Sequence, residues 1–286
     1  MAQRPISETR ILITGATDGL GRGVAARLAG AGATLLIHGR DAAKLATTAD
    51  EIRAVTGNDR ITTHRADLAS LDEVAALAEE VQRSTDQVHV LINNAGIGTG
   101  KPDLGTRQES RDGHELRFAV NYLAGFALTL RLLPLLMRSA PARVVNVASL
   151  GQAPIEFDDP MIREAYSGAR AYGQSKLAQI TAGFELASRL PAEQVTVNSF
   201  HPATYMPTKI VLLQAGHSID TLEEGIDATV RLATSPDLEG VTGRFYDRQN
   251  ESRPHEQAYD ANARASLWKL SLELTGIADP TAPGES

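Results

Sequence analysis

The sequence predicts an α/β fold in which helices cover both faces of a mostly parallel, doubly wound sheet. Short apolar runs alternate with amphipathic stretches along the chain, a pattern typical of strand–helix crossovers. The early runs are apolar almost throughout, as expected of strands that are covered on both faces. A glycine-rich turn joins the first run to the first amphipathic stretch, which indicates a strand that leads directly into a helix.

Each element is placed by its own apolar period and by the turn residues that flank it. The strands are expected at Arg10–Thr14, Thr34–His38, Ile61–Ala66, Val88–Asn93, Arg143–Ala148, Gln194–Phe200 and Gly243–Tyr246. The helices are expected near Gly19–Gly30, Ala42–Thr56, Leu71–Ser84, Gly113–Arg138, Ala171–Leu190, Leu222–Thr234 and Tyr259–Thr275.

No linker divides the chain, so residues 1–286 are expected to form a single domain. Two segments interrupt the alternation, at about 151–168 and 202–219. Both follow strands and should leave the carboxyl edge of the sheet, where ligands bind in such folds. They are the predicted substrate loops. Residues 278–286 contain two prolines and are expected to form a flexible tail.

The composition excludes several classes of protein. With 42% hydrophobic and 22% charged residues, the chain is an ordinary soluble globular protein. A net charge of −7 without a basic run argues against nucleic-acid binding. The absence of cysteine excludes disulfides and thiolate sites, and it is compatible with the cytoplasmic location that we expect. The apolar stretch Leu123–Met137 contains Arg131 and Pro134 and is too short for a membrane span.

The segment from Thr14 to Gly21 has the properties of a phosphate cradle. Glycines after a strand permit a tight turn and close approach of the backbone to a pyrophosphate. The helix that follows offers free N–H groups and the positive end of its dipole. By itself this G-x-x-x-G-x-G spacing is equally compatible with a helix entry that binds nothing. The candidate contacts are Gly15, Thr17, Asp18, Gly19, Leu20 and Gly21.

Further polar and small residues follow the later strands. Asp67 and Leu68 come after the third strand, and the carboxylate could face an adenine amino group. Asn94, Ala95 and Gly96 come after the fourth strand, and Ser149 comes after the fifth. Tyr172 and Lys176 are four residues apart on a predicted helix, so they share a face.

With these segments in this order, the chain resembles the short-chain dehydrogenase/reductase family over roughly Arg10 to Tyr246. The long interval from Ser149 to Tyr172 and the segment from Tyr166 to Leu177 resemble its retinol-dehydrogenase-like branch. The resemblance implies one three-layer Rossmann-type domain with a seven-stranded sheet and a nicotinamide cofactor. It implies an oxidoreductase acting on CH–OH or C=O groups of a small-molecule substrate.

The resemblance also assigns roles to individual residues. Tyr172 matches the general acid/base, and Lys176 the residue that lowers its pKa and holds the nicotinamide ribose. Ser149 matches the residue that binds the substrate oxygen. Asn121 matches the asparagine that supports a proton relay. The matching cofactor contacts in this half of the chain are Tyr172, Lys176, Pro202 and Thr204.

The second strand predicts which nicotinamide cofactor is used. NAD-preferring members of the family carry a carboxylate where Gly39 lies, and here Arg40 follows instead. A guanidinium matches a 2′-phosphate with charge-assisted hydrogen bonds. We therefore expect NADP(H) rather than NAD(H). The alternative is that Arg40 is a solvated loop cation.

Two features concern the substrate. The family usually has Pro-Gly after the sixth strand, whereas this chain has Pro202-Ala203. The predicted pocket walls, Leu150–Phe157, Gly98–Lys101 and Tyr205–Leu213, carry few charges. An uncharged, small to medium-sized or lipophilic carbonyl or alcohol is therefore expected.

Two other functions are weighed against this one. A catalytically silent NADP(H)-binding redox sensor would have the same fold, but such proteins often lose the tyrosine or the lysine. A sugar-nucleotide epimerase would favour a different glycine spacing and a larger C-terminal region. No His/Asp/Glu cluster has the spacing of metal ligands, so no metal is expected.

The helices near Gly113–Arg138 and Ala171–Leu190 carry more apolar residues than a one-faced helix needs. This surplus, with the resemblance, predicts a homodimer or homotetramer built on these helices. The alternative is that residues such as Leu132 and Leu136 fill the core of the monomer.

Overall fold

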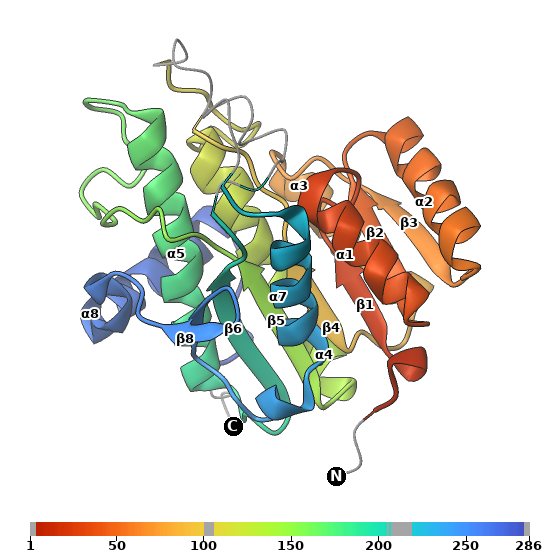
Figure 1. Ribbon diagram of the computed structural model, residues 1–286. Coiled ribbons are helices and arrows are strands. Elements are labelled where there is room, and N and C mark those ends of the chain that lie inside the picture. The colour runs from red at the N-terminus through yellow and green to blue at the C-terminus, as the bar shows by residue number, and fades with distance from the viewer. Residues whose placement is uncertain (1–3, 100–105, 205, 207–218, 283–286) are drawn as a thin grey trace.

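The computed structural model describes residues 4–99, 106–204, 206 and 219–282 of the chain. It contains one sheet covered by helices on both faces (Figure 1). The strand order is β3-β2-β1-β4-β5-β6-β7-β8, and every neighbouring pair is parallel except β7 and β8. The strands are β1 (Arg10–Ile13), β2 (Thr34–Gly39), β3 (Ile61–Arg65), β4 (Val90–Asn93), β5 (Ala142–Val147), β6 (Val195–His201), β7 (Phe245–Asp247) and β8 (Asn250–Ser252).

The expected Rossmann-type architecture is confirmed, but the described sheet has eight strands rather than seven. The additional strand β8 pairs antiparallel with β7 at the edge of the sheet. It has three residues, and Asn250 and Glu251 are exposed. An edge strand this short and polar has no apolar period, which is why the sequence pattern does not indicate it.

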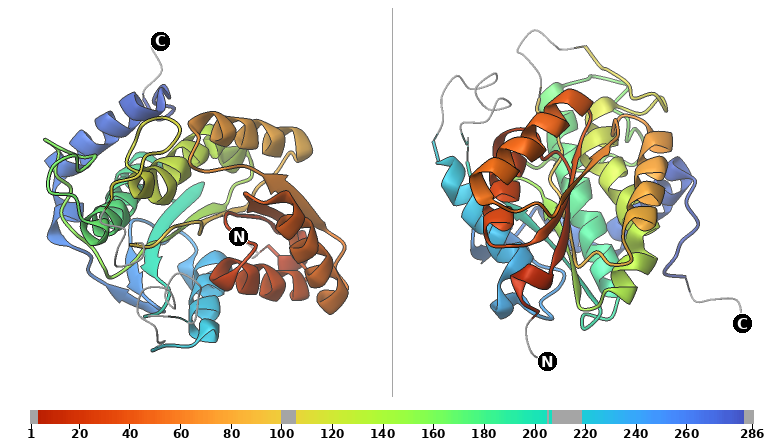
Figure 2. Two further views of the ribbon diagram at one scale, coloured as in Figure 1. Left: turned by 90° about the horizontal axis from the view of Figure 1, so that it is seen from above. Right: turned by 90° about the vertical axis from the view of Figure 1, so that its right-hand side faces the viewer.

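The helices form two layers with a further helix outside them. Helices α1, α2 and α7 cover one face of the sheet, α3, α4 and α5 cover the other, and α8 lies against α5 (Figures 1 and 2). Their bounds are α1 (Gly19–Gly30), α2 (Ala42–Thr56), α3 (Leu71–Ser84), α4 (Ala124–Arg138), α5 (Gly168–Arg189), α7 (Leu222–Thr234) and α8 (Ala261–Thr275). Short 3-10 helices are η1 (Ile6–Glu8), η3 (Pro236–Leu238) and η4 (Glu256–Tyr259), and η2 (Phe118–Leu123) is a π-helix.

Burial on both faces explains why the central strands are apolar throughout. In β1, Leu12 joins the core beneath α3 and α4, while Ile11 and Ile13 join the core beneath α1 and α7. All three side chains are fully buried. Alternate residues of a strand point to opposite faces, so a strand covered on both sides needs apolar residues at every position.

The helix expected over Gly113–Arg138 starts later than predicted. Glu115 forms an isolated bridge with Glu109, and its carboxylate accepts the Phe118 N–H at 2.7 Å. The helical segment then begins with the π-turn η2, which carries Asn121, and continues as α4. A π-turn inside a helix is often found at a functional site.

Helix α8 covers part of the apolar surface that α4 and α5 present. Tyr122 and Ser271 share a hydrogen bond of 2.5 Å, and Phe126 meets Trp268 edge-to-face with ring centroids 5.2 Å apart. The leucines of α4 at positions 132 and 136 are fully buried within the single chain. The apolar surplus of these helices is therefore used inside the chain and is no evidence for a partner subunit.

Among the described residues, one helical stretch, Phe118–Arg138, is long and apolar enough to cross a membrane, but 72% of its apolar window is buried inside the protein. Such burial is what the core helix of a globular domain shows. The start of the predicted flexible tail is also held in place. Asp279 accepts hydrogen bonds from Trp268 Nε1 at 2.8 Å and from Arg189 Nη1 at 3.0 Å, whereas residues 283–286 lie outside the described part.

Candidate active site

The glycine-rich turn between β1 and α1 is closed against the end of β4. Gly15 has φ +67°, and a Cβ atom there would lie 2.8 Å from Ala95 Cα. A Cβ at Gly21 would overlap the Gly15 carbonyl and lie 2.5 Å from Asn94 Nδ2. That amide donates to Thr14 O at 2.8 Å and to Gly15 O at 3.0 Å. Only glycine leaves this backbone exposed for a ligand, so the turn fits a pyrophosphate.

His38 holds the same turn from below, a role that the sequence did not indicate. Its Nδ1 accepts the Gly15 N–H at 3.2 Å, and its Nε2 is 3.0 Å from Ala66 O. The ring is 2% exposed, and burial lowers its pKa to about 4. The neutral tautomer with the proton on Nε2 satisfies both contacts. His38 thus connects the cradle to the end of β3.

Helix α1 starts at an exposed capping residue. Asp18 caps the helix by accepting the Gly19 N–H at 2.8 Å and is exposed. Thr17 is half-buried, whereas Leu20 is buried in the core beneath α1. A helix N-terminus with unpaired N–H groups favours phosphate.

The end of β2 carries a glycine rather than a carboxylate at position 39. A Cβ at Gly39 would lie 2.6 Å from Thr17 Cγ2, so a larger side chain does not fit without movement. The next residue, Arg40, is exposed. Within the described ranges its guanidinium has no hydrogen-bond or ion-pair partner, so this cation remains available to an anionic ligand.

Asp67 and Leu68 lie at the end of β3, beside the same edge. Leu68 is buried. The Asp67 carboxylate accepts the Ala69 N–H at 3.1 Å and lies 3.7 Å from Arg111 Nη2, and the Asp67 N–H donates to Glu73 at 2.8 Å. The carboxylate is therefore oriented by its neighbours and keeps some exposure, as a contact to an adenine amino group requires.

The structure brings Ser149 and Tyr172 together. Both lie against Gly151, where a Cβ atom would be 3.4 Å from Ser149 Oγ and 3.7 Å from Tyr172 Cε1. Ser149 Oγ accepts the Gly151 N–H at 3.0 Å, which orients it. A side chain at Gly151 would therefore contact both hydroxyl-bearing residues.

Lys176 and Asn121 lie on the other side of Tyr172. Lys176 Nζ donates to Val147 O at 2.8 Å and is 5.9 Å from the Tyr172 ring centroid. The Asn121 side chain accepts the Ile97 N–H at 2.7 Å and donates to Ser175 Oγ at 3.0 Å. Both side chains lie close to Gly96. A Cβ atom at Gly96 would be 3.6 Å from Lys176 Nζ and 3.3 Å from Asn121 Oδ1. Three segments distant in sequence therefore meet at one point.

The expected lowering of the Tyr172 pKa is not found in the protein alone. Burial raises the pKa of Tyr172, although its hydrogen bond with Ser149 acts in the opposite direction. Burial also lowers the pKa of Lys176 to about 8. The expectation rested on the attraction of the ammonium and of a positively charged nicotinamide, whereas the loss of hydration penalises both charged forms.

Thr204 belongs to a polar cluster after β6. Its N–H donates to Asp220 at 2.6 Å and its hydroxyl lies 3.1 Å from His201 Nε2. Asp220 is also paired with Arg248. Pro202 is buried beside this cluster. Residues 205 and 207–218, which include most of the predicted 202–219 loop and the Tyr205–Leu213 wall, lie outside the described part. So do residues 100 and 101 of the Gly98–Lys101 wall.

A buried ion pair supports the other predicted loop, and sequence reasoning missed it. Arg117 and Glu115 are 3.3 Å apart and almost fully buried. Tyr166 donates to Glu115 at 3.0 Å and accepts from Arg117 at 2.6 Å. Arg117 also donates to the carbonyls of Gly98 and Thr99 at 2.8 and 2.7 Å. This node joins the segment after β4 to the loop 151–168. The only signal was a charged pair next to an apolar run.

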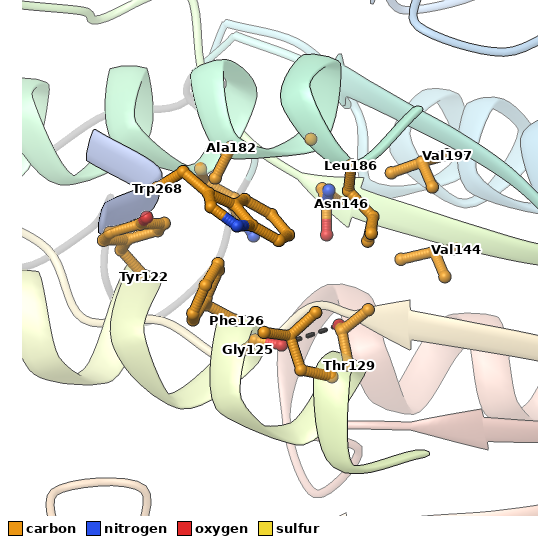
Figure 3. Close-up of a pocket in the computed structure, with 13 residues that line it drawn as sticks. Tyr122, Gly125, Phe126, Thr129, Val144, Asn146, Ala182, Leu186, Val197 and Trp268 are labelled. Carbon is orange, nitrogen blue, oxygen red and sulfur yellow. Dashed lines mark hydrogen bonds between the residues drawn. The ribbon is translucent and has the colours of Figure 1, made fainter. Parts of the chain in front are cut away.

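A separate small cavity of about 30 Å³ lies deeper, between α4, α5 and α8 (Figure 3). Tyr122, Phe126 and Trp268 line it, and Asn146 faces it from β5. It is distinct from the open edge of the sheet where the cradle and Tyr172 lie. Among the described residues, no three His, Asp or Glu side chains gather in a way that could hold a metal ion.

Comparisons with known proteins agree with this geometry. The family model for short chain dehydrogenase matches residues 9–212. Human retinol dehydrogenase 14 is 34% identical, with 93% of this chain and 86% of that protein covered. A crystal structure of an uncharacterized protein from Mycobacterium paratuberculosis is 29% identical with a TM-score of 0.77, covering 98% of this chain and 97% of that one.

A solved complex of RhlG from Pseudomonas aeruginosa with NADP in the active site is 27% identical with a TM-score of 0.70. The match covers 86% of this chain and 97% of that one. One conclusion follows from these similarities, from the glycine cradle and from the meeting of Ser149, Tyr172 and Lys176. The chain belongs to the short-chain dehydrogenase family, within its retinol-dehydrogenase-like branch, and is a nicotinamide-dependent oxidoreductase acting on CH–OH or C=O groups.

Proposed function

We propose that this enzyme uses NADP(H) to interconvert a carbonyl and an alcohol on a small uncharged or lipophilic substrate. The observation that carries the proposal is the convergence of Ser149, Tyr172, Lys176 and Asn121 at the open edge of the sheet, beside the glycine cradle. Each of these four side chains is held by backbone or side-chain contacts, as a catalytic group must be.

The residues that would hold the cofactor are distributed along the same edge. The cradle from Gly15 to Gly21 would bind the pyrophosphate, Asp67 the adenine, and Asn94 to Gly96 the nicotinamide half. The nicotinamide half would also be contacted by Lys176, Tyr172, Pro202 and Thr204. When bound, the nicotinamide supplies or accepts the hydride.

In the reductive direction, the Tyr172 hydroxyl gives its proton to the substrate oxygen. Its raised pKa keeps the phenol protonated at neutral pH, so the proton is available. Ser149, already oriented by Gly151, donates a hydrogen bond to the same oxygen. Lys176, with a pKa of about 8, is still mostly protonated at pH 7 and stabilises the phenolate that forms. Asn121 holds the backbone of Ile97 next to this centre.

The preference for NADP(H) is supported by the end of β2. Gly39 offers no carboxylate to a ribose 2′-hydroxyl, and Arg40 has no partner within the described ranges. A free guanidinium matches a 2′-phosphate. If Arg40→Ala left the NADPH dissociation constant unchanged, the preference would be refuted.

The lipophilic substrate class is supported by the match to retinol dehydrogenase 14 and by the sparse charge of the loop from Leu150 to Phe157. The test is oxidation of NADPH and NADH with a panel of aldehydes, ketones, quinones and retinal. Wild type and Tyr172→Phe are compared. Turnover with NADPH that disappears in the variant supports the proposal. Tight NADPH binding without turnover in either direction, with alcohols included, supports the silent redox sensor instead.

We also propose that residues 1–286 form a single domain and that the protein is cytoplasmic, which cell fractionation tests. A homodimer or homotetramer must use a surface other than the one that α8 covers, and sedimentation velocity at micromolar concentration decides whether one forms.

A further inference from the structure

Arg65, at the end of β3, lies beside the residue that we assign to the 2′-phosphate. Strands β2 and β3 are parallel and in register, with Gly39 opposite Arg65. Arg65 Nε donates to the Arg40 backbone carbonyl at 3.4 Å. We propose that Arg65 is a second arginine for the 2′-phosphate and acts with Arg40. This inference rests on the proposed use of NADP(H).

The direction of the Arg65 side chain follows from the register. Paired residues on neighbouring strands project to the same face of a sheet. A Cβ at Gly39 would point at Thr17 in the cofactor cradle. The Cβ atom of Arg65 therefore leaves the sheet on the side of the cradle, one strand further out, while its guanidinium reaches Glu73 at the start of α3. Its side chain is 53% exposed, so it fills no core position and can reorient toward a ligand.

Arg65 shares its anionic partner with a second arginine. Its anionic partner is Glu73, with Nη1 and Oε2 3.2 Å apart. Glu73 is also paired with Arg111 at 2.7 Å, and it accepts the Asp67 N–H at 2.8 Å. Arg111 also lies 3.7 Å from the Asp67 carboxylate, and of the two contacts that Glu73 makes with arginines the longer is the one to Arg65.

The chemistry of a phosphate monoester matches this arrangement. It carries about −1.5 to −2 charges near neutral pH and three acceptor oxygens, so two guanidinium groups neutralise it better than one. In NAD(H) this group is absent. A residue that contacts only the 2′-phosphate must therefore change the affinity for NADPH and leave that for NADH unchanged.

The experiment measures dissociation constants by titration calorimetry, so it needs no substrate. The ligands are NADPH, NADH and 2′,5′-ADP, and the variants are Arg65→Ala, Arg65→Lys, Arg40→Ala and Arg83→Ala. Arg83 is the matched control because it is an exposed arginine in the last turn of α3, paired with Glu79. Thermal melts verify that each variant is folded.

We expect Arg65→Ala to weaken NADPH and 2′,5′-ADP about 10-fold, with NADH within about twofold, because one charge-assisted hydrogen-bonded pair is lost. Arg65→Lys should recover part of the loss, and Arg83→Ala should change nothing. Equal losses for NADPH and NADH would overturn the inference, since Arg65 would then act on the shared part of the cofactor. An effect of Arg40→Ala without one of Arg65→Ala overturns the role of Arg65 and leaves NADP(H) use intact. If neither variant alters NADPH binding, both proposals fail.

Discussion

His38 makes the stability of this protein depend on pH in a way that can be calculated. Its pKa is lowered from 6.5 to about 4 because the ring is buried between the cradle and β3. The unfolded chain therefore binds a proton at a higher pH than the folded chain does. The contribution of His38 to stability is complete above pH 6.5, decreases as the pH falls toward 4, and changes no further below that.

The size of the effect follows from the two pKa values. The full difference corresponds to about 3 kcal/mol, and at pH 5 about 2 kcal/mol of it is already lost. His89, whose pKa is also lowered to about 4, adds a loss in the same pH range. Wild type alone therefore cannot separate the two histidines, and a variant of His38 is needed.

The assay is urea unfolding at pH 7.5 and pH 5.0 for wild type and His38→Gln. Glutamine can donate and accept hydrogen bonds but does not titrate. The variant should lose about 2 kcal/mol less than wild type between the two pH values, whatever its stability at pH 7.5. His114→Gln, at a half-buried histidine outside the sheet, is the control for replacing a histidine elsewhere in the chain. Equal pH dependence in His38→Gln and wild type would refute the argument.

Three further predictions follow from the site. Gly21→Ala should abolish measurable NADPH binding by calorimetry, because the added Cβ overlaps the backbone of the cradle. The control is Gly30→Ala in the same helix, which has room for a Cβ and should bind NADPH normally. Normal binding by Gly21→Ala would contradict the close packing. Tyr172→Phe should reduce turnover by roughly 100-fold or more while the NADPH dissociation constant stays within about twofold, and a variant with substantial turnover would remove Tyr172 from the mechanism. Arg117→Met should cost about 3–5 kcal/mol in urea unfolding because Glu115 is left buried without its partner; a loss below about 1 kcal/mol would show that the pair is dispensable.

The sequence by itself determined most of the fold. Two kinds of local pattern account for this: continuous apolar strands such as β1, and helices that directly follow a capping residue, as after Asp18, Asp41, Ser70 and Thr221. They depend on side-chain period and capping, which neighbouring residues decide. The candidate site residues were also indicated by sequence, because the family resemblance is carried by short contiguous segments. Their roles stay predictions.

The tertiary structure alone decided those features that depend on residues distant in the chain. The pairing of β8, the late start of the helix that carries Asn121, and the covering of α4 by α8 each depend on contacts across many residues. The raised pKa of Tyr172 has the same origin, since hydration is lost only when the whole site is assembled. The position of Arg65 beside Arg40 depends on the pairing of two strands from different parts of the chain, and that pairing exists only in the assembled sheet.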